Sequence, residues 1–230
     1  MKKNMLLIGG SYGIGQYLAK SLVPDFTMYV ASRTKGDLGS LQLVHIPFDA
    51  TADTLDLGLL PQELHGFAYL PGSISLKPFK RIDLEGFKED MHINFFAMVK
   101  VVQQIMPRMA ENSSMVFFST VAVKKGMPFH TSIAASKGAI EGFARSLAAE
   151  YAPKIRVNVI APSLVDSPLA SKLLNTEAKR KNMASRHPLK KIGDTADIGN
   201  AAQFLLSDKS AWITGQVIGV DGGLSTLSTD

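Results

Sequence analysis

The sequence predicts an α/β fold, a doubly wound sheet of about seven parallel strands with helices on both faces. Three observations support this prediction: short apolar runs recur along the chain, helical patterns separate them, and a glycine-rich turn joins the first run to the first helical pattern. Continuous apolar strands that alternate with helices are typical of a parallel sheet buried on both faces. The expected strands are Met5–Ile8, Thr27–Ala31, Leu41–Ile46, Gly66–Leu70, Ser114–Ser119, Ile155–Ile160 and Gln216–Val220.

The turn after the first strand is the strongest local signal. Residues 8–15 read Ile-Gly-Gly-Ser-Tyr-Gly-Ile-Gly, and a helical pattern follows them. Gly9 can close a tight turn, Gly13 lets the backbone approach a pyrophosphate, and Gly15 allows close packing of the helix. Strand, glycine turn and helix together favour a Rossmann-type dinucleotide site over an ordinary strand–helix turn.

Two long helical patterns lie in the middle of the chain. Apolar residues at helical spacing predict a helix over Asp83–Met109 that Pro107 bends or ends, and a second helix runs from Ser132 to Tyr151, before Pro153. The apolar stripe of the first helix suits a core or a subunit interface better than a ligand site. It comprises Phe87, Met91, Phe95, Met98, Val102 and Ile105. The short link between the second and third strands leaves room only for a stunted helix.

Composition narrows the class of protein. The 230 residues fit a single domain, 1–230, and 46% hydrophobic with 20% charged residues is ordinary for a soluble globular chain. The net charge of +5 comes without an arginine-rich tail, so an anionic small ligand is favoured over nucleic acid. The chain has no cysteine, and no His/Asp/Glu cluster has metal-ligand spacing, so we expect no metal. Without a signal peptide or a run of ~20 apolar residues, the expected location is the cytoplasm, away from membranes.

The order of these features resembles the short-chain dehydrogenase/reductase family over nearly the whole chain. The glycine turn resembles that family's cofactor loop, Asp49-Ala50 its adenine contact, and the segment from Arg156 to Pro162 its sixth strand and proline-led loop. Val220-Asp221-Gly222-Gly223 resembles its last strand. The cofactor-binding residues that follow are Gly9, Ser11, Tyr12, Gly13, Ile14, Gly15, Ser32, Arg33, Asp49, Ala50, Leu70, Pro71, Gly72, Lys137, Pro162, Val165 and Ser167.

The same resemblance implies a catalytic set with one altered member. Asn94, Thr120 and Lys137 stand where the family has its catalytic Asn, Ser and Lys, but Ile133 occupies the usual tyrosine position, four residues before Lys137. Isoleucine has no proton to give, and general acid assistance is typically worth ~10²–10⁴ in rate. Ordinary carbonyl reduction should therefore be impaired, whereas an enoyl substrate would relax the requirement.

Another group can be considered as the acid. His130 lies seven residues before Lys137, a spacing that resembles the Tyr-to-Lys spacing of enoyl reductases in the same family. Imidazole is a competent proton donor, although a histidine just before a helix is also common at a surface loop. Two further departures are Ser163, where the family has a glycine after Pro162, and Tyr69-Leu70-Pro71-Gly72 after the fourth strand.

The end of the second strand indicates the nucleotide. It reads Val-Ala-Ser-Arg-Thr, with no carboxylate at the tip to bind a ribose 2′-hydroxyl. Arg33, helped by Ser32 or Ser11, can bind a 2′-phosphate through paired hydrogen bonds, so NADP(H) is the expected cofactor. The alternative is that Arg33 is a solvated loop residue.

A long excursion over 163–192 is the candidate lid. It carries Lys172, Lys179, Arg180, Lys181, Arg186, Lys190 and Lys191 against Asp166 and Glu177. As a lid it would suit an acidic partner, such as a carrier protein or an acyl thioester of coenzyme A, but a solvated amphipathic helix is the simpler interpretation. His187-Pro188 is interpreted as loop punctuation.

Two functions from different classes remain open at this point. The first is an NADP(H)-dependent oxidoreductase that acts on a carbonyl or enoyl substrate with altered proton donation. The second is a non-catalytic NADP(H)-binding sensor or structural subunit. The family resemblance also implies a homodimer or homotetramer that pairs through the two long helices, with part of the contact from the stripe between Phe87 and Met109.

Overall fold

The computed structural model describes residues 2–228 and contains a seven-stranded, fully parallel sheet in the order β3-β2-β1-β4-β5-β6-β7. This confirms the predicted doubly wound α/β fold, with all seven expected strands present. Their bounds are β1 (Asn4–Ile8), β2 (Thr27–Ser32), β3 (Val44–Pro47), β4 (Leu64–Tyr69), β5 (Met109–Phe118), β6 (Ile155–Pro162) and β7 (Val217–Val220).

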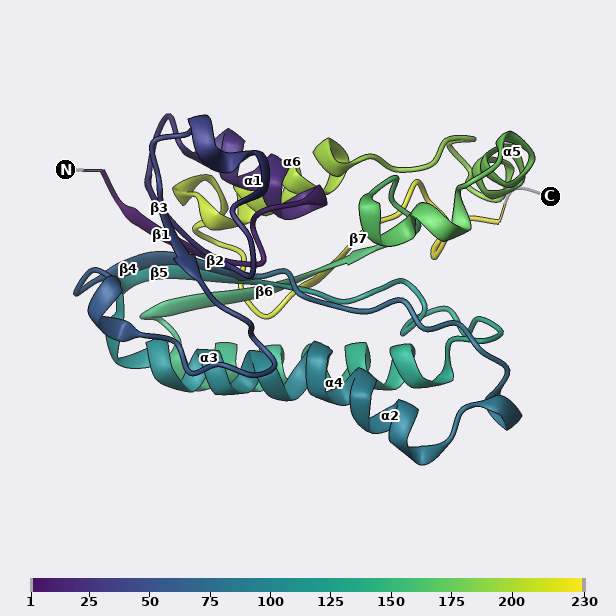
Figure 1. Ribbon diagram of the computed structural model, residues 1–230, viewed down its shortest axis with the longest axis horizontal. Coiled ribbons are helices and arrows are strands. Elements are labelled where there is room, and N and C mark those ends of the chain that lie inside the picture. Colours follow the sequence, from purple (N-terminus) through teal and green to yellow (C-terminus); the bar gives the residue numbers. More distant parts are fainter. Residues whose placement is uncertain (1, 229–230) are drawn as a thin grey trace.

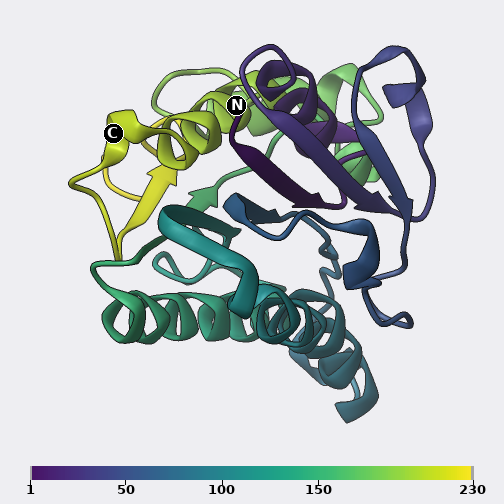
Figure 2. The ribbon, with the colours of Figure 1, turned by 90° about the vertical axis from the view of Figure 1, so that its left-hand side faces the viewer.

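Helices cover both faces of the sheet, as Figure 1 and the end-on view of Figure 2 show. On one face lie α1 (Gly13–Leu22) and α6 (Thr195–Leu206), and on the other α2 (Leu84–Met91), α3 (Ala97–Ile105) and α4 (Thr131–Tyr151). Each layer has its own apolar cluster, because the strand side chains alternate between the two faces. A last helix, α5 (Glu177–Ser185), lies apart from both layers, at the right of Figure 1.

The helix expected over Asp83–Met109 is divided into three parts. α2 ends at Met91, a π-helical turn covers His92–Phe96, and α3 then runs to Ile105, before a 3₁₀ turn that contains Pro107. The π turn adds a residue and rotates the apolar stripe, so Met98, Val102 and Ile105 enter the core while Phe87 and Met91 stay partly exposed. A single 3.6-residue period could not predict this break.

The segments between the early strands are short. Only a 3₁₀ turn at Gly36–Ser40 separates β2 from β3, as the short link predicted. The third strand begins at Val44 rather than Leu41, because the backbone N–H groups of Leu41 and Leu43 form turn hydrogen bonds instead of pairing with a neighbouring strand. No helix among residues 2–228 is long and apolar enough to cross a membrane.

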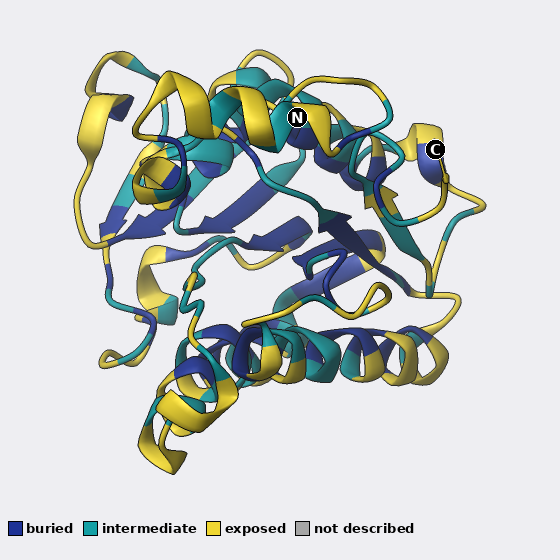
Figure 3. Cartoon of the chain, turned by 90° about the vertical axis from the view of Figure 1, so that its right-hand side faces the viewer, coloured by how far each residue is buried: buried dark blue, intermediate teal, exposed yellow. Residues whose placement is uncertain are grey.

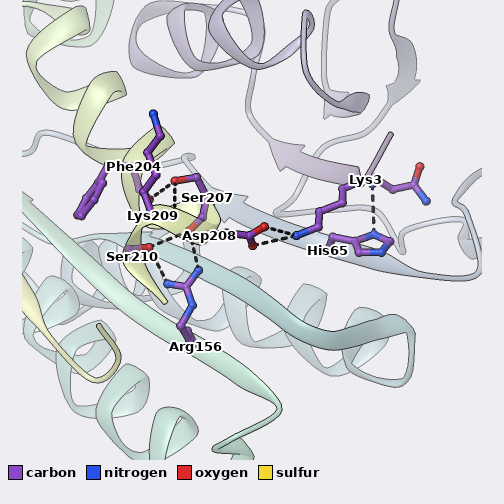
Figure 4. Close-up of polar contacts among 9 residues, drawn as sticks. Lys3, His65, Arg156, Phe204, Ser207, Asp208, Lys209 and Ser210 are labelled. Atoms are coloured by element: carbon purple, nitrogen blue, oxygen red, sulfur yellow. Dashed lines mark hydrogen bonds and ion pairs between the residues drawn. The ribbon is translucent and has the colours of Figure 1, made fainter. Parts of the chain in front are cut away.

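The amino ends of the strands are closed by polar contacts to the end of α6, drawn in Figure 4. The Arg156 guanidinium donates to the carbonyl oxygens of Leu205 and Ser207, each at 3.1 Å, and to the Ser210 hydroxyl at 2.8 Å. A cation at the carboxyl end of a helix satisfies carbonyls that have no partner within the helix. Close by, the more exposed Lys3 pairs with Asp208 at 2.8 Å.

The carboxyl ends of the strands point to the opposite side, which faces the viewer in Figure 3. There the buried strands lead into loops that contain both exposed and partly buried residues. The helix α5 lies on the same side of the sheet. In open parallel sheets, ligands bind at this edge, where the strand order changes direction. β1 and β4 are neighbours at the point where it does so here.

Candidate active site

The glycine turn after β1 forms a cradle of backbone groups. Gly9 and Gly13 have positive φ angles of +81° and +55°, which side chains with a Cβ rarely adopt. A Cβ on Gly15 would overlap the Gly9 carbonyl oxygen, so the helix starts directly against the turn. The N-cap residue Tyr12 makes no side-chain capping bond, and the first turn of α1 has no acidic residue. The free N–H groups at this helix end therefore suit a pyrophosphate.

A cavity of about 360 Å³ opens at the carboxyl edge beside this cradle. Its lining comes from the turn, from the loops after β4, β5 and β6, from the start of α4 and from the lid segment. Many of the predicted cofactor residues therefore line one space: Gly9, Tyr12, Gly13, Ile14, Gly15, Leu70, Gly72, Lys137, Pro162, Val165 and Ser167.

The remaining predicted cofactor residues lie outside this lining: Ser11, Ser32, Arg33, Asp49, Ala50 and Pro71. Arg33 is exposed and has no hydrogen bond or ion pair within residues 2–228, so its donors are available. The Ser32 hydroxyl is buried and already donates to the Thr34 carbonyl oxygen at 2.8 Å. Hydrogen bonds from the Thr51 side chain and backbone, and the charge of Arg33, hold the pKa of Asp49 below its usual value.

Three of the predicted catalytic positions meet in the cavity. Ile133 and Lys137 lie one helical turn apart on α4, and Thr120 faces the same space from the loop after β5. The Lys137 ammonium donates to the Phe118 carbonyl oxygen at 2.9 Å. Burial lowers the pKa of Lys137 to about 8, although the negative charge of Asp90 acts in the opposite direction. Lys137 thus stays mainly charged at neutral pH and can hold a sugar hydroxyl.

Asn94 lies in the π turn and is buried behind the cavity rather than in its lining. Its amide donates to Ser73 Oγ at 2.9 Å and to the Asp90 carbonyl oxygen at 2.8 Å. Ser73 in turn donates to one oxygen of the Asp90 carboxylate at 2.6 Å, and the other oxygen has no hydrogen-bond partner among residues 2–228. Gly72 lies between, since a Cβ there would be 3.0 Å from Asn94 Oδ1 and 3.2 Å from Lys137 Nζ. Ser73 and Asp90 could not be predicted from the sequence, because neither belongs to a recognisable motif.

The tyrosines do not occupy the region around Ile133. Tyr12 lines the cavity at its cofactor end, where its hydroxyl accepts a hydrogen bond from Thr34 at 3.3 Å. The other four tyrosines of the chain are absent from the lining. Tyr69, for example, is buried and donates to the Ile93 carbonyl oxygen at 3.0 Å.

Two histidines line the cavity instead. His130 precedes α4, and its Nδ1 lies 2.6 Å from the Pro128 carbonyl oxygen. His187 is 4% exposed, and its two ring nitrogens contact Ser163 Oγ at 2.8 Å and the Met183 carbonyl oxygen at 2.9 Å. The interpretation of His187-Pro188 as loop punctuation therefore missed a buried, hydrogen-bonded side chain. No local signal could reveal it, because Ser163 lies 24 residues away in the sequence.

The lid segment is joined to the sheet edge at its base. Val165 bridges Gly193, and the Asp166 backbone N–H donates to the Gly193 carbonyl oxygen at 2.8 Å. Between these points run a 3₁₀ turn at Pro168–Leu173 and α5. Two of the seven basic residues are ion-paired, Arg180 with Asp166 and Lys191 with Asp197. The rest remain without an acidic partner in the part of the chain that the structure describes, so the segment keeps a positive surface.

Comparisons with known proteins agree with this geometry. Residues 55–225 match the model of a family described as enoyl-(acyl carrier protein) reductase. The chain is 37% identical over 147 residues to the 3-oxoacyl-[acyl-carrier-protein] reductase of Thermotoga maritima, covering 63% of this chain and 59% of that protein. It is 29% identical over 234 residues to L-xylulose reductase of Bos taurus, covering 96% of each. A solved structure of a short-chain dehydrogenase family protein from Francisella tularensis aligns over 99% of this chain and 100% of its own, with TM-score 0.90 and 26% identity.

Proposed function

Because this chain belongs to the short-chain dehydrogenase/reductase family, we propose that it is an NADP(H)-dependent oxidoreductase that reduces a carbonyl or enoyl group with an altered proton donor. The observation that carries the proposal is the shared cavity: the phosphate cradle, Thr120 and Lys137 all line it. The nicotinamide cofactor would supply hydride when bound. The residues of the chain must hold it, orient the acceptor and provide a proton.

Each retained residue has a defined task under this proposal. The N–H groups at the start of α1 hold the pyrophosphate, and the Lys137 ammonium holds the nicotinamide ribose. The Thr120 hydroxyl donates a hydrogen bond to the acceptor oxygen. The buried network of Ser73, Asp90 and Asn94 keeps the lysine side of the cavity in place. Ile133 offers only hydrocarbon at the position where the family uses a phenol.

Arg33 supports the choice of NADP(H) over NAD(H). Its guanidinium is exposed just after β2, forms no hydrogen bond or ion pair among residues 2–228, and matches a phosphate geometrically. We expect NADPH to raise Tm more than NADH at equal concentration, since a ligand that binds the folded state stabilises it. Arg33→Ala should remove the difference, while Lys20→Ala, at the far end of α1, should leave it intact. Equal shifts with both nucleotides in the unaltered protein would contradict this choice.

The basic lid favours an acidic, acyl-bearing substrate. Lys172 and Lys181 are exposed and have no ion pair in the described chain. They lie on the lid segment, 163–192, which contributes to the lining of the cavity. A carrier protein or a coenzyme A thioester would present negative charge to this surface. The match to the enoyl reductase family and the 3-oxoacyl reductase relative support the same class of substrate.

A substrate panel tests this function directly. The protein is incubated with NADPH and a set of ketones, 3-oxoacyl thioesters and enoyl thioesters, and NADPH oxidation is followed. We expect turnover of at least one thioester, with a KM that rises when Lys172 and Lys181 are changed together to Ala. Tight NADPH binding without any oxidation would instead favour a non-catalytic sensor or structural subunit, which the family comparisons do not favour.

We further propose that the active form is a homodimer or homotetramer that pairs through the faces of α2, α3 and α4 turned away from the sheet. Phe96 is exposed on this side, and Phe87 and Met91 are only partly covered. Light scattering should report a multiple of 24.8 kDa. A monomeric mass would contradict the assembly without touching the proposed reaction.

A further inference from the structure

Ser163 and His187 form a hydrogen-bonded pair inside the cavity that the family resemblance does not account for. Ser163 follows the last residue of β6, and His187 lies just beyond α5, so the two come from opposite ends of the lid segment. Both line the cavity, and the His187 ring is almost completely buried. A buried imidazole that contacts a hydroxyl in a substrate-sized cavity is a candidate for general acid–base catalysis.

The second contact of the imidazole fixes the direction of the hydrogen bonds. The Met183 carbonyl oxygen can only accept, so Nδ1 of His187 carries a proton and donates it. In the neutral ring Nε2 is then a lone-pair acceptor, and the Ser163 hydroxyl donates to it across 2.8 Å. In the protonated ring Nε2–H donates to Ser163 Oγ, and the serine proton turns toward the cavity.

The sheet places this pair beside Thr120. β5 and β6 are neighbours, with Phe118 opposite Ile160, and the Val121 backbone N–H donates to the Pro162 carbonyl oxygen at 3.1 Å. The loops that carry Thr120 and Ser163 are therefore joined directly after the strands end. An acceptor oxygen bound by the Thr120 hydroxyl would lie next to the segment that holds Ser163.

Charged groups around His187 are of both signs. Burial by itself would raise the pKa of Asp221, but hydrogen bonds from Ser225 and Gly223 and the nearby His187 together hold it below its ordinary value. This carboxylate lies directly after β7 and places a negative charge near His187. Arg186 and Lys190, which flank His187 in the sequence, are exposed and bond to other groups, Met183 Sδ and the Ser185 carbonyl oxygen.

We propose that Ser163 and His187 deliver the proton that Ile133 cannot, an inference that rests on the proposed reductase function. When the carbonyl carbon receives a hydride, the electrons of the C=O π bond would move to the oxygen, and that oxygen would take the Ser163 hydroxyl proton to give the alcohol. Ser163 Oγ takes the Nε2 proton of His187 in the same relay. His187 is left neutral with Nδ1–H on Met183, and it regains a proton from solvent after product leaves the open cavity.

Paired variants test the relay, with NADPH and the carbonyl substrate on which the unaltered protein is most active. Ser163→Ala and His187→Gln should each lower kcat by about 100-fold or more, the usual worth of a general acid, with NADPH affinity unchanged. Ser163→Thr keeps a hydroxyl and should retain most of the activity. The matched control is His92→Gln, since His92 is an exposed histidine outside the cavity.

Chemical rescue separates proton transfer from a structural role. His187→Gly should regain turnover when free imidazole is added, because the removed ring borders an open cavity, whereas Ser163→Ala should not respond. The protein without nucleotide offers an independent readout: when the pH is raised until the His187 ring is neutral, ¹⁵N-histidine NMR should show the remaining ring proton on Nδ1, with the signals identified by their loss in His187→Gln.

Several outcomes would overturn the relay. Full turnover in Ser163→Ala and His187→Gln, or a neutral His187 in the Nε2–H form, removes it alone. Loss of turnover in His130→Ala, with the two relay variants still active, transfers the acid role to His130. Absence of turnover by the unaltered protein on every carbonyl substrate removes the proposed function and the relay with it.

Discussion

The two ends of the sheet use polar groups in opposite ways. At the amino ends, the Arg156 guanidinium binds the terminal carbonyls of α6 and the Ser210 hydroxyl (Figure 4). At the carboxyl ends, the N-cap residue of α1 makes no side-chain capping bond, and one Asp90 oxygen has no hydrogen-bond partner among the described residues. Burial at the same end lowers the pKa of Lys137. At the amino end the Arg156 contacts satisfy the helix carbonyls internally, although Ser113 Oγ is buried there without a partner among residues 2–228, whereas the carboxyl end leaves the N–H groups of the cradle available.

This difference indicates that residues at the amino ends of the strands mainly stabilise the fold, whereas residues at the carboxyl ends mainly serve ligand binding and chemistry. A change at the amino end should alter the free energy of unfolding and leave ligand binding alone. A change at the carboxyl end should alter ligand binding or reaction rate, whether or not it also alters stability. Variants at both ends of the sheet test that separation, beginning with the change that should alter activity most.

The largest effect is expected at Ile133. In a Ser163→Ala background, Ile133→Tyr should raise NADPH-dependent ketone reduction by about 10²–10⁴-fold, because it restores a general acid one helical turn from Lys137. Ile133→Phe fills the same space without a hydroxyl and should give no gain. Equal rates for the two variants would show that Thr120 and Lys137 are not arranged for carbonyl reduction.

A methyl group on Gly15 should damage the cradle itself. Its Cβ would overlap the backbone of Gly9 and Gly10, so Gly15→Ala should lower the free energy of unfolding by about 3 kcal/mol and weaken NADPH binding severely. Gly39 has no atom within 4 Å of the Cβ position, so Gly39→Ala is the matched control and should do neither. Denaturant unfolding and nucleotide titration measure the two effects. Normal NADPH binding by Gly15→Ala would contradict the role of the turn.

At the amino end, Arg156→Ala should cost stability without changing nucleotide affinity. It leaves helix carbonyls without their charged donor, at about 2–3 kcal/mol, as for hydrogen bonds to charged groups. Lys3→Ala breaks a solvent-exposed ion pair and should cost less than about 1 kcal/mol. Urea unfolding of both variants gives the comparison. A loss of NADPH affinity in Arg156→Ala would show that the two ends are coupled.

The pKa of Lys137 predicts a pH dependence of stability. The folded protein releases this proton near pH 8, whereas the unfolded chain keeps it until about 10.5, so between these values the unfolded chain binds more protons. Stability from this group therefore rises with pH across that window, by about 3 kcal/mol at roughly 1.4 kcal/mol per pKa unit. The measurement is the difference in unfolding free energy between the unaltered protein and Lys137→Met from pH 7.5 to 10.5. Parallel curves would show that burial does not shift Lys137.

Much of the fold could be predicted from sequence because its signals are local. Runs such as Met5–Ile8 are buried on both faces, so they appear in the sequence as unbroken apolar stretches, and each of them forms a strand. Strand starts were less accurate: β5 begins at Met109 rather than Ser114, because Glu111 and Asn112 lie exposed at its amino end. Asn112 has a positive φ of 60°, which periodicity alone cannot reveal.

The candidate site was predictable only where backbone geometry defines it. The cradle is encoded by glycine spacing, and Ile133 with Lys137 by helical spacing. The partners of Lys137 and Asn94, and the contact of Ser163 with His187, join segments far apart in the chain. Such pairings depend on how loops fold back over the sheet, which no local pattern in the sequence specifies.

The β-bridge between Val165 and Gly193 brings the two ends of the lid segment together. The stretch it closes leaves the sheet and returns to it at almost the same place. Such a stretch can differ between proteins of this fold while the strands keep their register. A descendant of this chain could acquire a new substrate by replacing parts of that stretch, provided that Ser167, a predicted cofactor contact, and His187 were kept.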